Sequence, residues 1–287
     1  MTDDELPEAL FLRAAAADTA DGGIGVAATP LARGPWDAGM LHGGAVCGLV
    51  GWAVEQVAPA GLQLARLTVE LWRPVGLEPV TVRSRVARGG RRLAVVDATV
   101  SDGDTTLVRA TSTWVAPQRG DATTTFAGRS ATPPPMPLEA VDPAAGGFDY
   151  PRPGFNCDAV ELRSVHGDTE TPGPAVLWAR VRRPVVAGTP LTPLQTVATL
   201  SDLVAAVGWD WGPGGVAMIN PDVTLQLHRL PEGDWVCVDA AARINGAAVG
   251  WCGGTLADDH GVFGHVLQSQ TASPYRLAVD PTDPEVR

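Results

Sequence analysis

The sequence predicts an α+β protein with two tandem modules, each a long apolar helix packed on a curved antiparallel sheet. Three observations support this prediction: two apolar helical segments, two series of alternating strands, and an internal repeat that relates them. The chain has 287 residues, of which 45% are hydrophobic and 18% are charged. It is therefore long enough and apolar enough to form two modules with a substantial core.

The first half of the chain predicts one helix followed by an antiparallel meander. The segment 41–57, LHGGAVCGLVGWAVEQV, is small or apolar on every side, which is typical of a buried helix. Apolar and polar residues then alternate, as Val80 and Val82 do with Arg83 and Arg85, and turns rich in glycine separate the alternating segments. The expected strands are 66–72, 80–86, 93–100 and 107–115.

The second half of the chain repeats this pattern after a break. Residues 117–153 are rich in Thr, Ala, Gly and Pro, so we expect a linker between modules at 1–116 and 154–287. A second mostly apolar helix is expected at 194–209. The expected strands of this half are 176–186, 223–230, 235–244, 248–257 and 262–269.

The two halves align with each other at one constant offset. Thr68 aligns with Thr224 and Arg73 with Arg229, and both pairs are separated by 156 positions (224 − 68 and 229 − 73). The same offset places Val80 on Val236. The repeated unit is a helix followed by about four antiparallel strands.

Composition excludes several classes of protein. The net charge is −11 and no basic stripe is visible, which argues against a protein that binds nucleic acid or docks on anionic membranes. The chain has no lysine, so it cannot form a Schiff base or a P-loop. We expect no signal peptide and no membrane span. The cysteines lack CxxC spacing and the histidines lack ligand spacing, so we expect a cytoplasmic protein with no metal and no cofactor.

Four short motifs, in a particular order and spacing, carry a family resemblance. They are His42-Gly43-Gly44, Leu200-Ser201-Asp202, Asn220-Pro221-Asp222-Val223-Thr224 with His228-Arg229, and Gly264-His265-Val266-Leu267-Gln268-Ser269. Over residues 25–270 the sequence resembles the thioesterase-like superfamily with a double hot-dog fold, and it is similar to type II acyl-CoA thioesterases. The resemblance implies that the substrate is an acyl-CoA, hydrolysed by water to a free acid and CoA.

The resemblance also implies a trio of residues that activates the water. The trio is an acid in the second helix, a Thr or Ser in the following strand, and a Gln in the last strand. The acid corresponds to Asp202 and the Gln to Gln268. Asn220 occupies the hydroxyl position, which departs from the family pattern, and Thr224 is the alternative. The family often has a second acid in the first helix, but Gly51 and Trp52 stand there and Glu55 comes a turn later, so only the second module is expected to carry the acid.

The residue types of this trio suit the chemistry. A carboxylate among Ala, Leu and Val is costly to bury, so Asp202 either acts as a general base that orients a water or faces solvent as a capping residue. Gln268 would hold the same water from the opposite strand, although a strand glutamine also commonly points outward. Asn220 can hold a water by hydrogen bonds but supplies no hydroxyl.

Two further segments are candidates for substrate binding. Gly43 and Gly44, after His42, would let the thioester oxygen approach the N–H groups of a helix N-terminus. The alternative is that the glycines only allow a loop with positive φ angles. Arg88 and Arg91 flank a turn, and they either bind the phosphates of CoA or are simply solvated.

Three functional hypotheses follow, and thioester hydrolysis is the first of them. The chain has no G-x-S-x-G motif, so an α/β-hydrolase is excluded. The second hypothesis is a non-catalytic protein that binds acyl-CoA or lipid, which Asn220 at the hydroxyl position favours. The third is a hot-dog enoyl-CoA hydratase, which the residues around Asn220-Pro221 match poorly. Because exposed sheet edges are usually covered, we expect a homo-oligomer, most simply a dimer.

Overall fold

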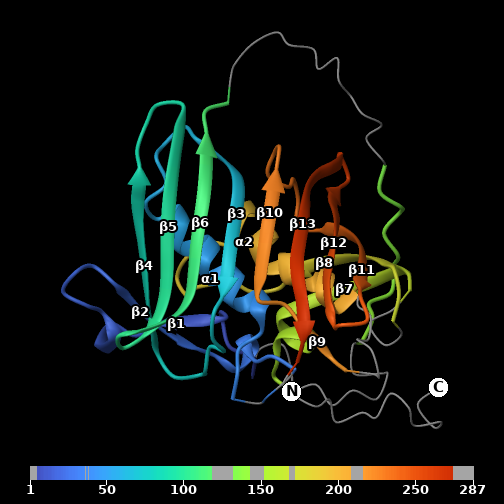
Figure 1. The fold of residues 1–287 in the computed structure, drawn as a ribbon, viewed down its shortest axis with the longest axis horizontal. Helices are drawn as coiled ribbons and strands as arrows, with labels where there is room; N and C mark the ends of the chain where they lie inside the picture. The colour runs from blue at the N-terminus through green and yellow to red at the C-terminus, as the bar shows by residue number, and fades with distance from the viewer. Residues whose placement is uncertain are drawn as a thin grey trace.

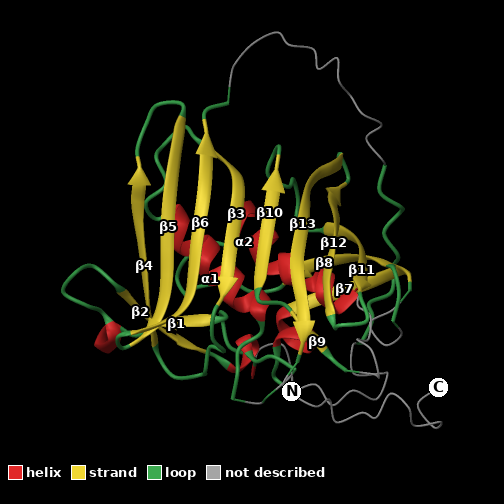
Figure 2. Ribbon diagram, viewed as in Figure 1, coloured by secondary structure: helices red, strands yellow, loops and turns green. Residues whose placement is uncertain are grey.

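One antiparallel sheet and a small number of helices make up the computed structural model of the chain (Figure 1). The structure describes residues 5–35, 37, 39–117, 132–142, 152–167, 172–207 and 216–273. The sheet has 13 strands, in the order β1-β2-β4-β5-β6-β3-β10-β13-β12-β11-β8-β7, with the short β9 paired to β13. The helices α1 and α2 lie together on one face of this sheet, behind the strands in the view of Figure 2.

The first half contributes six strands and one long helix. The sequence predicted the helix and the last four strands, and the structure confirms them within a few residues. The two short strands near the N-terminus were not predicted. The elements are β1 (Phe11–Arg13), β2 (Ile24–Ala28), α1 (Gly43–Glu55), β3 (Gln63–Leu71), β4 (Val80–Arg88), β5 (Leu93–Asp102) and β6 (Thr105–Val115), with 3-10 turns η2 (Ala15–Ala17) and η3 (Pro30–Ala32).

The second half has the same order of helix and four strands. Before them the chain forms a π-helical turn, η4, and the strand β7, neither of which the sequence predicted. The elements are η4 (Phe155–Ala159), β7 (Val160–His166), β8 (Ala175–Val181), α2 (Pro193–Leu200), η5 (Ser201–Leu203), α3 (Val204–Val207), β9 (Met218–Ile219), β10 (Asp222–Leu227), β11 (Val236–Ile244), β12 (Val249–Asp258) and β13 (Gly261–Ala272).

The prediction of one continuous second helix was wrong. The α-helical hydrogen bonding of α2 ends at Leu200, a 3-10 turn follows at Ser201–Leu203, and only then does α3 begin. The Ser201 hydroxyl donates to the carbonyl of Ala198 at 2.7 Å, a bond that competes with regular helix geometry. The end of the predicted segment, 208–209, lies outside the described residues.

The internal repeat is visible in how the two halves meet. The strands β3 and β10 pair side by side in the middle of the sheet, with Thr68 opposite Thr224 (Figure 1). These are the two threonines that the offset of 156 aligns, so each repeat meets its own equivalent at the joint. An approximate two-fold axis therefore passes beside the Thr68–Thr224 pair, whose hydroxyl oxygens lie 3.2 Å apart.

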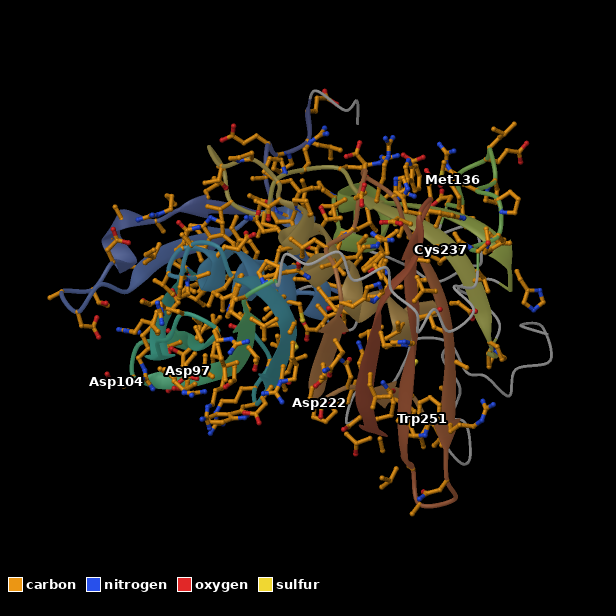
Figure 3. All side chains as sticks on the ribbon, turned by 90° about the horizontal axis from the view of Figure 1, so that it is seen from above. Asp97, Asp104, Met136, Asp222, Cys237 and Trp251 are labelled. Carbon is orange, nitrogen blue, oxygen red and sulfur yellow. The ribbon has the colours of Figure 1, made fainter. Side chains whose placement is uncertain are left out.

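The core lies between the helices and the inner face of the sheet. Fully buried residues from both halves meet there, including Leu49 of α1, Leu67 of β3 and Leu225 of β10. Alternate residues of the same strands face away from the helices, and Figure 3 shows Asp97 and Asp222 on that outer side. Part of the predicted linker crosses the outer side, because the Pro134 carbonyl accepts a hydrogen bond from the Trp178 indole at 3.0 Å. Linker residues 118–131 and 143–151 lie outside the described residues.

The helices α1 and α2 pack closely because glycines of α1 lie where the two helices touch. A Cβ on Gly48 would lie 2.3 Å from the Thr199 hydroxyl oxygen, and one on Gly51 would lie 2.9 Å from the Ala198 Cβ. Only hydrogen atoms at these positions allow α1 and α2 to approach so closely. Among the described residues, no helix is long and apolar enough to cross a membrane.

Candidate functional site

Asp202 is the centre of the candidate site. It lies in the 3-10 turn η5, and only 6% of its surface is exposed. Its side chain lies against the N-terminus of α1. A Cβ on Gly43 would lie 2.6 Å from the Asp202 Oδ2 atom, so a side chain at this position would collide with the carboxylate. A glycine is therefore required at position 43 for the Asp202 carboxylate to lie against the N-terminus of α1.

Two amide side chains donate to one oxygen of this carboxylate. The Nδ2 atom of Asn220, just before β10, lies 2.9 Å from Asp202 Oδ1, and the Nε2 atom of Gln268, in β13, lies 3.3 Å from it. Gln268 is fully buried and also donates to the Ser201 carbonyl at 3.2 Å. The structure thus brings together three residues that the sequence singled out, from three different elements.

His42 contacts the other oxygen of the carboxylate. It is the N-cap residue of α1, and its Nδ1 atom lies 3.1 Å from Asp202 Oδ2 and 2.9 Å from the Gly44 backbone nitrogen. One ring nitrogen cannot donate to the carboxylate and accept from the N–H at the same time. We assign the proton to Nδ1, which then donates a hydrogen bond to Asp202. With this assignment the Gly44 N–H also donates to the carboxylate.

These donors determine the charge state of Asp202. Burial alone would raise the pKa of this carboxyl, but hydrogen bonds and charge from His42, with further bonds from Asn220 and Gly44, lower the pKa below its ordinary value of 3.8. Asp202 is therefore ionised at neutral pH. In this structure the Gly44 N–H has its partners within the site, the His42 Nδ1 atom at 2.9 Å and the Asp202 carboxylate, and its role toward a thioester oxygen stays a prediction.

Phe155 was missed by the sequence analysis. It is fully buried in η4 and stacks on the His42 ring, with centroids 4.1 Å apart and planes 18° from parallel. The stack and the bond to Asp202 together fix the orientation of the imidazole ring. The only signal in the sequence was an aromatic residue next to the proline-rich linker, and its position there has no periodic pattern.

One polar atom of the site has no partner. The Oε1 atom of Gln268 is buried and accepts no hydrogen bond. Because the Nε2 atom of the same amide donates to Asp202 and Ser201, the orientation of the group is fixed and Oε1 faces elsewhere. A buried acceptor without a donor is costly, and a water molecule is the smallest group that could supply one.

Three other predicted residues lie apart from this cluster. The Thr224 hydroxyl is bonded to Thr68, on the side of β10 opposite the buried Val223 and Leu225. Arg88 and Arg91 are exposed at the hairpin between β4 and β5. Figure 1 shows this hairpin at one end of the sheet, whereas β9 and the end of β13 lie at the other.

A second carboxylate makes a related contact at the far end of the helix pair. The Glu55 carboxylate, at the end of α1, lies 2.8 and 2.9 Å from the hydroxyl oxygen of Thr192, the N-cap residue of α2, and accepts from Gln195 Nε2 at 2.7 Å. Each helix thus presents an acid to the cap of the other. On the sheet, however, the offset of 156 places Ser112 at the position of Gln268 and Leu64 at that of Asn220. The Glu55 cluster therefore has no equivalent of Asn220 or of Gln268.

The Glu55 contact predicts a pH dependence of stability. Burial raises the pKa of Glu55 above 4.5, against hydrogen bonds from Gln195 and Thr192. The folded state therefore favours the protonated form, and the contribution of this group is full below pH 4.5 and is lost as pH rises through the raised pKa. Relative to Glu55→Gln, the wild type should be more stable at pH 4 than at pH 7, as measured by urea unfolding. An equal difference at both pH values would contradict this assignment.

Comparisons with known proteins agree with the fold. The family model for the acyl-CoA thioesterase N-terminal domain matches residues 32–115, and the model for the acyl-CoA thioesterase C-terminal domain matches residues 130–271. Comparison with curated proteins gives no match. Among the described residues, no group of three or more His, Cys, Asp or Glu is arranged to hold a metal ion.

Solved structures with the same fold have distant sequences. The tesB protein of Mycobacterium avium subspecies paratuberculosis is 19% identical, with a TM-score of 0.61 over 88% of this chain and 93% of its own. A conserved protein with a hot dog fold from Alicyclobacillus acidocaldarius is 14% identical, with a TM-score of 0.68 over 88% and 94%. The acyl-CoA thioesterase II TesB2 of Mycobacterium marinum is 16% identical, with a TM-score of 0.57 over 83% and 91%.

Proposed function

This chain belongs to the acyl-CoA thioesterase family, and from that premise we propose that it hydrolyses an acyl-CoA thioester to a free carboxylic acid and CoA at Asp202. The observation that carries the proposal is the convergence of Asn220, Gln268 and His42 on one buried, ionised carboxylate. The Oε1 atom of Gln268 adds an acceptor without a partner, on the same amide that donates to that carboxylate, and we propose that a water binds there. Together these groups can hold and polarise one water molecule.

In the proposed reaction the water attacks the thioester carbon directly. One hydrogen of the water bonds to Gln268 Oε1 and the other to the Asp202 carboxylate, which takes this proton as the water oxygen bonds to carbon. The tetrahedral intermediate then collapses, the carbon–sulfur bond breaks, and the CoA thiolate leaves with its electron pair. The proton returns from Asp202 to the sulfur, so no covalent enzyme intermediate forms.

Asn220 has a defined part in this proposal. Its amide donates to Asp202, so it holds the carboxylate in place without a hydroxyl group. We propose Asn220, and not Thr224, as the third member of the trio, because Thr224 bonds to Thr68 on the other side of the strand. If Asn220 does not support turnover, the same site would bind acyl-CoA without hydrolysis, and the tests below separate the two roles.

The same proposal extends to the organisation of the protein. We propose a double hot-dog chain with modules at 1–116 and 154–287 and a linker at 117–153. The strand order ends at β1 and β7, but the outer side of β1 already bonds to residues 184–187. The edge of β7, which in the described residues is bridged by Val141 at Leu162, is therefore the edge that favours pairing with a second copy in a homodimer. None of the four cysteines forms a disulfide in the structure, which fits a cytoplasmic protein.

Gln268→Met tests the water-holding role directly. Methionine keeps the length of the side chain but offers no amide, so we expect kcat for CoA release to fall about a hundredfold with little change in KM. Release of CoA from a panel of acyl-CoAs, followed with a thiol reagent, measures this. Gln226→Met, on the exposed side of β10, is the matched control and should behave like the wild type. Equal activity of the two variants would remove Gln268 from the mechanism.

A further inference from the structure

Arg33 is placed next to the candidate site by its backbone. It follows η3 and forms an antiparallel bridge with Leu41. Its carbonyl accepts the N–H of Phe155 at 3.0 Å, and the carbonyl of the preceding Ala32 accepts the N–H of His42 at 2.9 Å. The two residues that form the ring stack of the site are therefore each anchored at Arg33 or its neighbour.

The guanidinium group of Arg33 has no ion-pair partner among the described residues. Its Nε atom is buried and has no hydrogen-bond partner, and in the described part of the chain no carboxylate forms an ion pair with it. Other arginines with restricted exposure are neutralised: Arg163 bonds to Glu161, and Arg229 bonds to Asp258. An unpaired, half-buried cation is costly, and it is unusual in a chain with a net charge of −11.

The chemistry of the guanidinium group favours an anion as its partner. A guanidinium presents planar pairs of N–H donors, which match the oxygens of a carboxylate or phosphate. Arg33 remains accessible because its side chain is only partly buried. It is not among the groups that bond to Asp202, so an anion bound here would be separate from the carbon that water attacks.

We propose that Arg33 binds an anionic group of the substrate and so positions the thioester at Asp202. This inference rests on the proposed function. Two parts of a substrate carry suitable oxygens: the phosphates of CoA, or a carboxylate at the far end of a dicarboxylic acyl chain. Both would fill the same donors, and the probes below separate them.

The test uses stable thioether analogues, which bind but cannot be hydrolysed. Three are needed: an S-alkyl-CoA, the matching S-alkyl-pantetheine without phosphates, and the matching S-(ω-carboxyalkyl)-pantetheine. Calorimetry gives their Kd values with the wild type, Arg33→Met and Arg33→Lys. Arg109→Met, an exposed arginine on β6, is the matched control. Thermal unfolding of each variant reports whether it is folded.

If Arg33 holds the phosphates, Arg33→Met should weaken the S-alkyl-CoA about tenfold or more and leave both pantetheine analogues unchanged. If it holds an acyl carboxylate, only the ω-carboxy analogue should weaken. Arg33→Lys should show a smaller loss on the same analogue, because it keeps the charge but not the planar donors. Each of these two patterns supports the proposal and identifies the anion.

Three results would overturn it: equal weakening of all three analogues, no change in any, or no binding to the wild type. The matched thioesters test the function separately. If the wild type binds the thioethers with the Arg33 pattern but hydrolyses no thioester, then the proposed hydrolysis fails and the anion site remains.

Discussion

Replacing Asp202 by asparagine should lower kcat for CoA release by about two to four orders of magnitude. Asparagine has nearly the same shape, and its carbonyl oxygen can still accept the bond from Asn220, but the amide cannot take a proton from water. KM should change little, because the substitution leaves the shape of the side chain nearly unchanged. The measurement is steady-state release of CoA from acyl-CoAs of several chain lengths, with binding of the intact substrates measured in parallel.

The matched control for this change is Asp239→Asn. Asp239 is exposed on β11 and has no contact with the site, so turnover should stay within experimental error of the wild type. If Asp202→Asn retains wild-type turnover, the assignment of the general base is wrong. If the wild type binds acyl-CoA without any turnover, the protein is a binding protein.

Replacing Asp258 by asparagine should cost about 3 kcal/mol of stability. Asp258 is fully buried at the end of β12 and accepts from both terminal nitrogens of Arg229, at 2.5 and 2.6 Å, and from the N–H groups of Glu232 and His260. An asparagine removes the negative charge and one of the two acceptor oxygens, which leaves Arg229 without its counter-charge. The conserved shape of the side chain separates this effect from loss of packing.

This contribution should also depend on pH. Burial would raise the pKa of Asp258, but hydrogen bonds from Arg229, Glu232 and His260 lower it below 3.8. Its stabilisation is therefore present above pH 3.8 and is lost as pH falls through the lowered pKa. Urea unfolding at pH 7 and pH 3 measures both effects. The exposed neighbour Asp259 is the control, and Asp259→Asn should stay within about 0.5 kcal/mol. Equal midpoints for the two variants at pH 7 would contradict the prediction.

The Arg229–Asp258 pair also explains one motif of the sequence. His228-Arg229 is part of a motif that carries the family resemblance, and the structure shows that Arg229 holds the turn between β12 and β13. Its guanidinium also lies 5.4 Å from the centre of the Phe263 ring. The motif therefore marks a residue that stabilises the fold, and it has no contact with Asp202 in the structure.

The sequence by itself determined the parts of this protein that depend on local patterns. Alternation of apolar and polar residues was sufficient to locate the strands β3 to β6 and β10 to β13, because every second side chain must face the core. The offset of 156 aligned Thr68 with Thr224, and the structure added that these two residues pair where the two halves meet. The family resemblance selected Asp202, Gln268 and Asn220 as candidates before their distances were known.

The tertiary structure decided what depends on contacts between distant segments. Only the approach of α1 showed that Gly43 is required beside Asp202, that His42 donates to it, and that Glu55 contacts the other helix cap. Phe155, and Arg33 without an ion-pair partner among the described residues, lie in sequence neighbourhoods with no pattern that could reveal them. Periodicity in the sequence indicates which face of a helix or strand is buried. The residue that it meets across the core depends on how helices and strands pack together, and a short stretch of sequence does not contain that information.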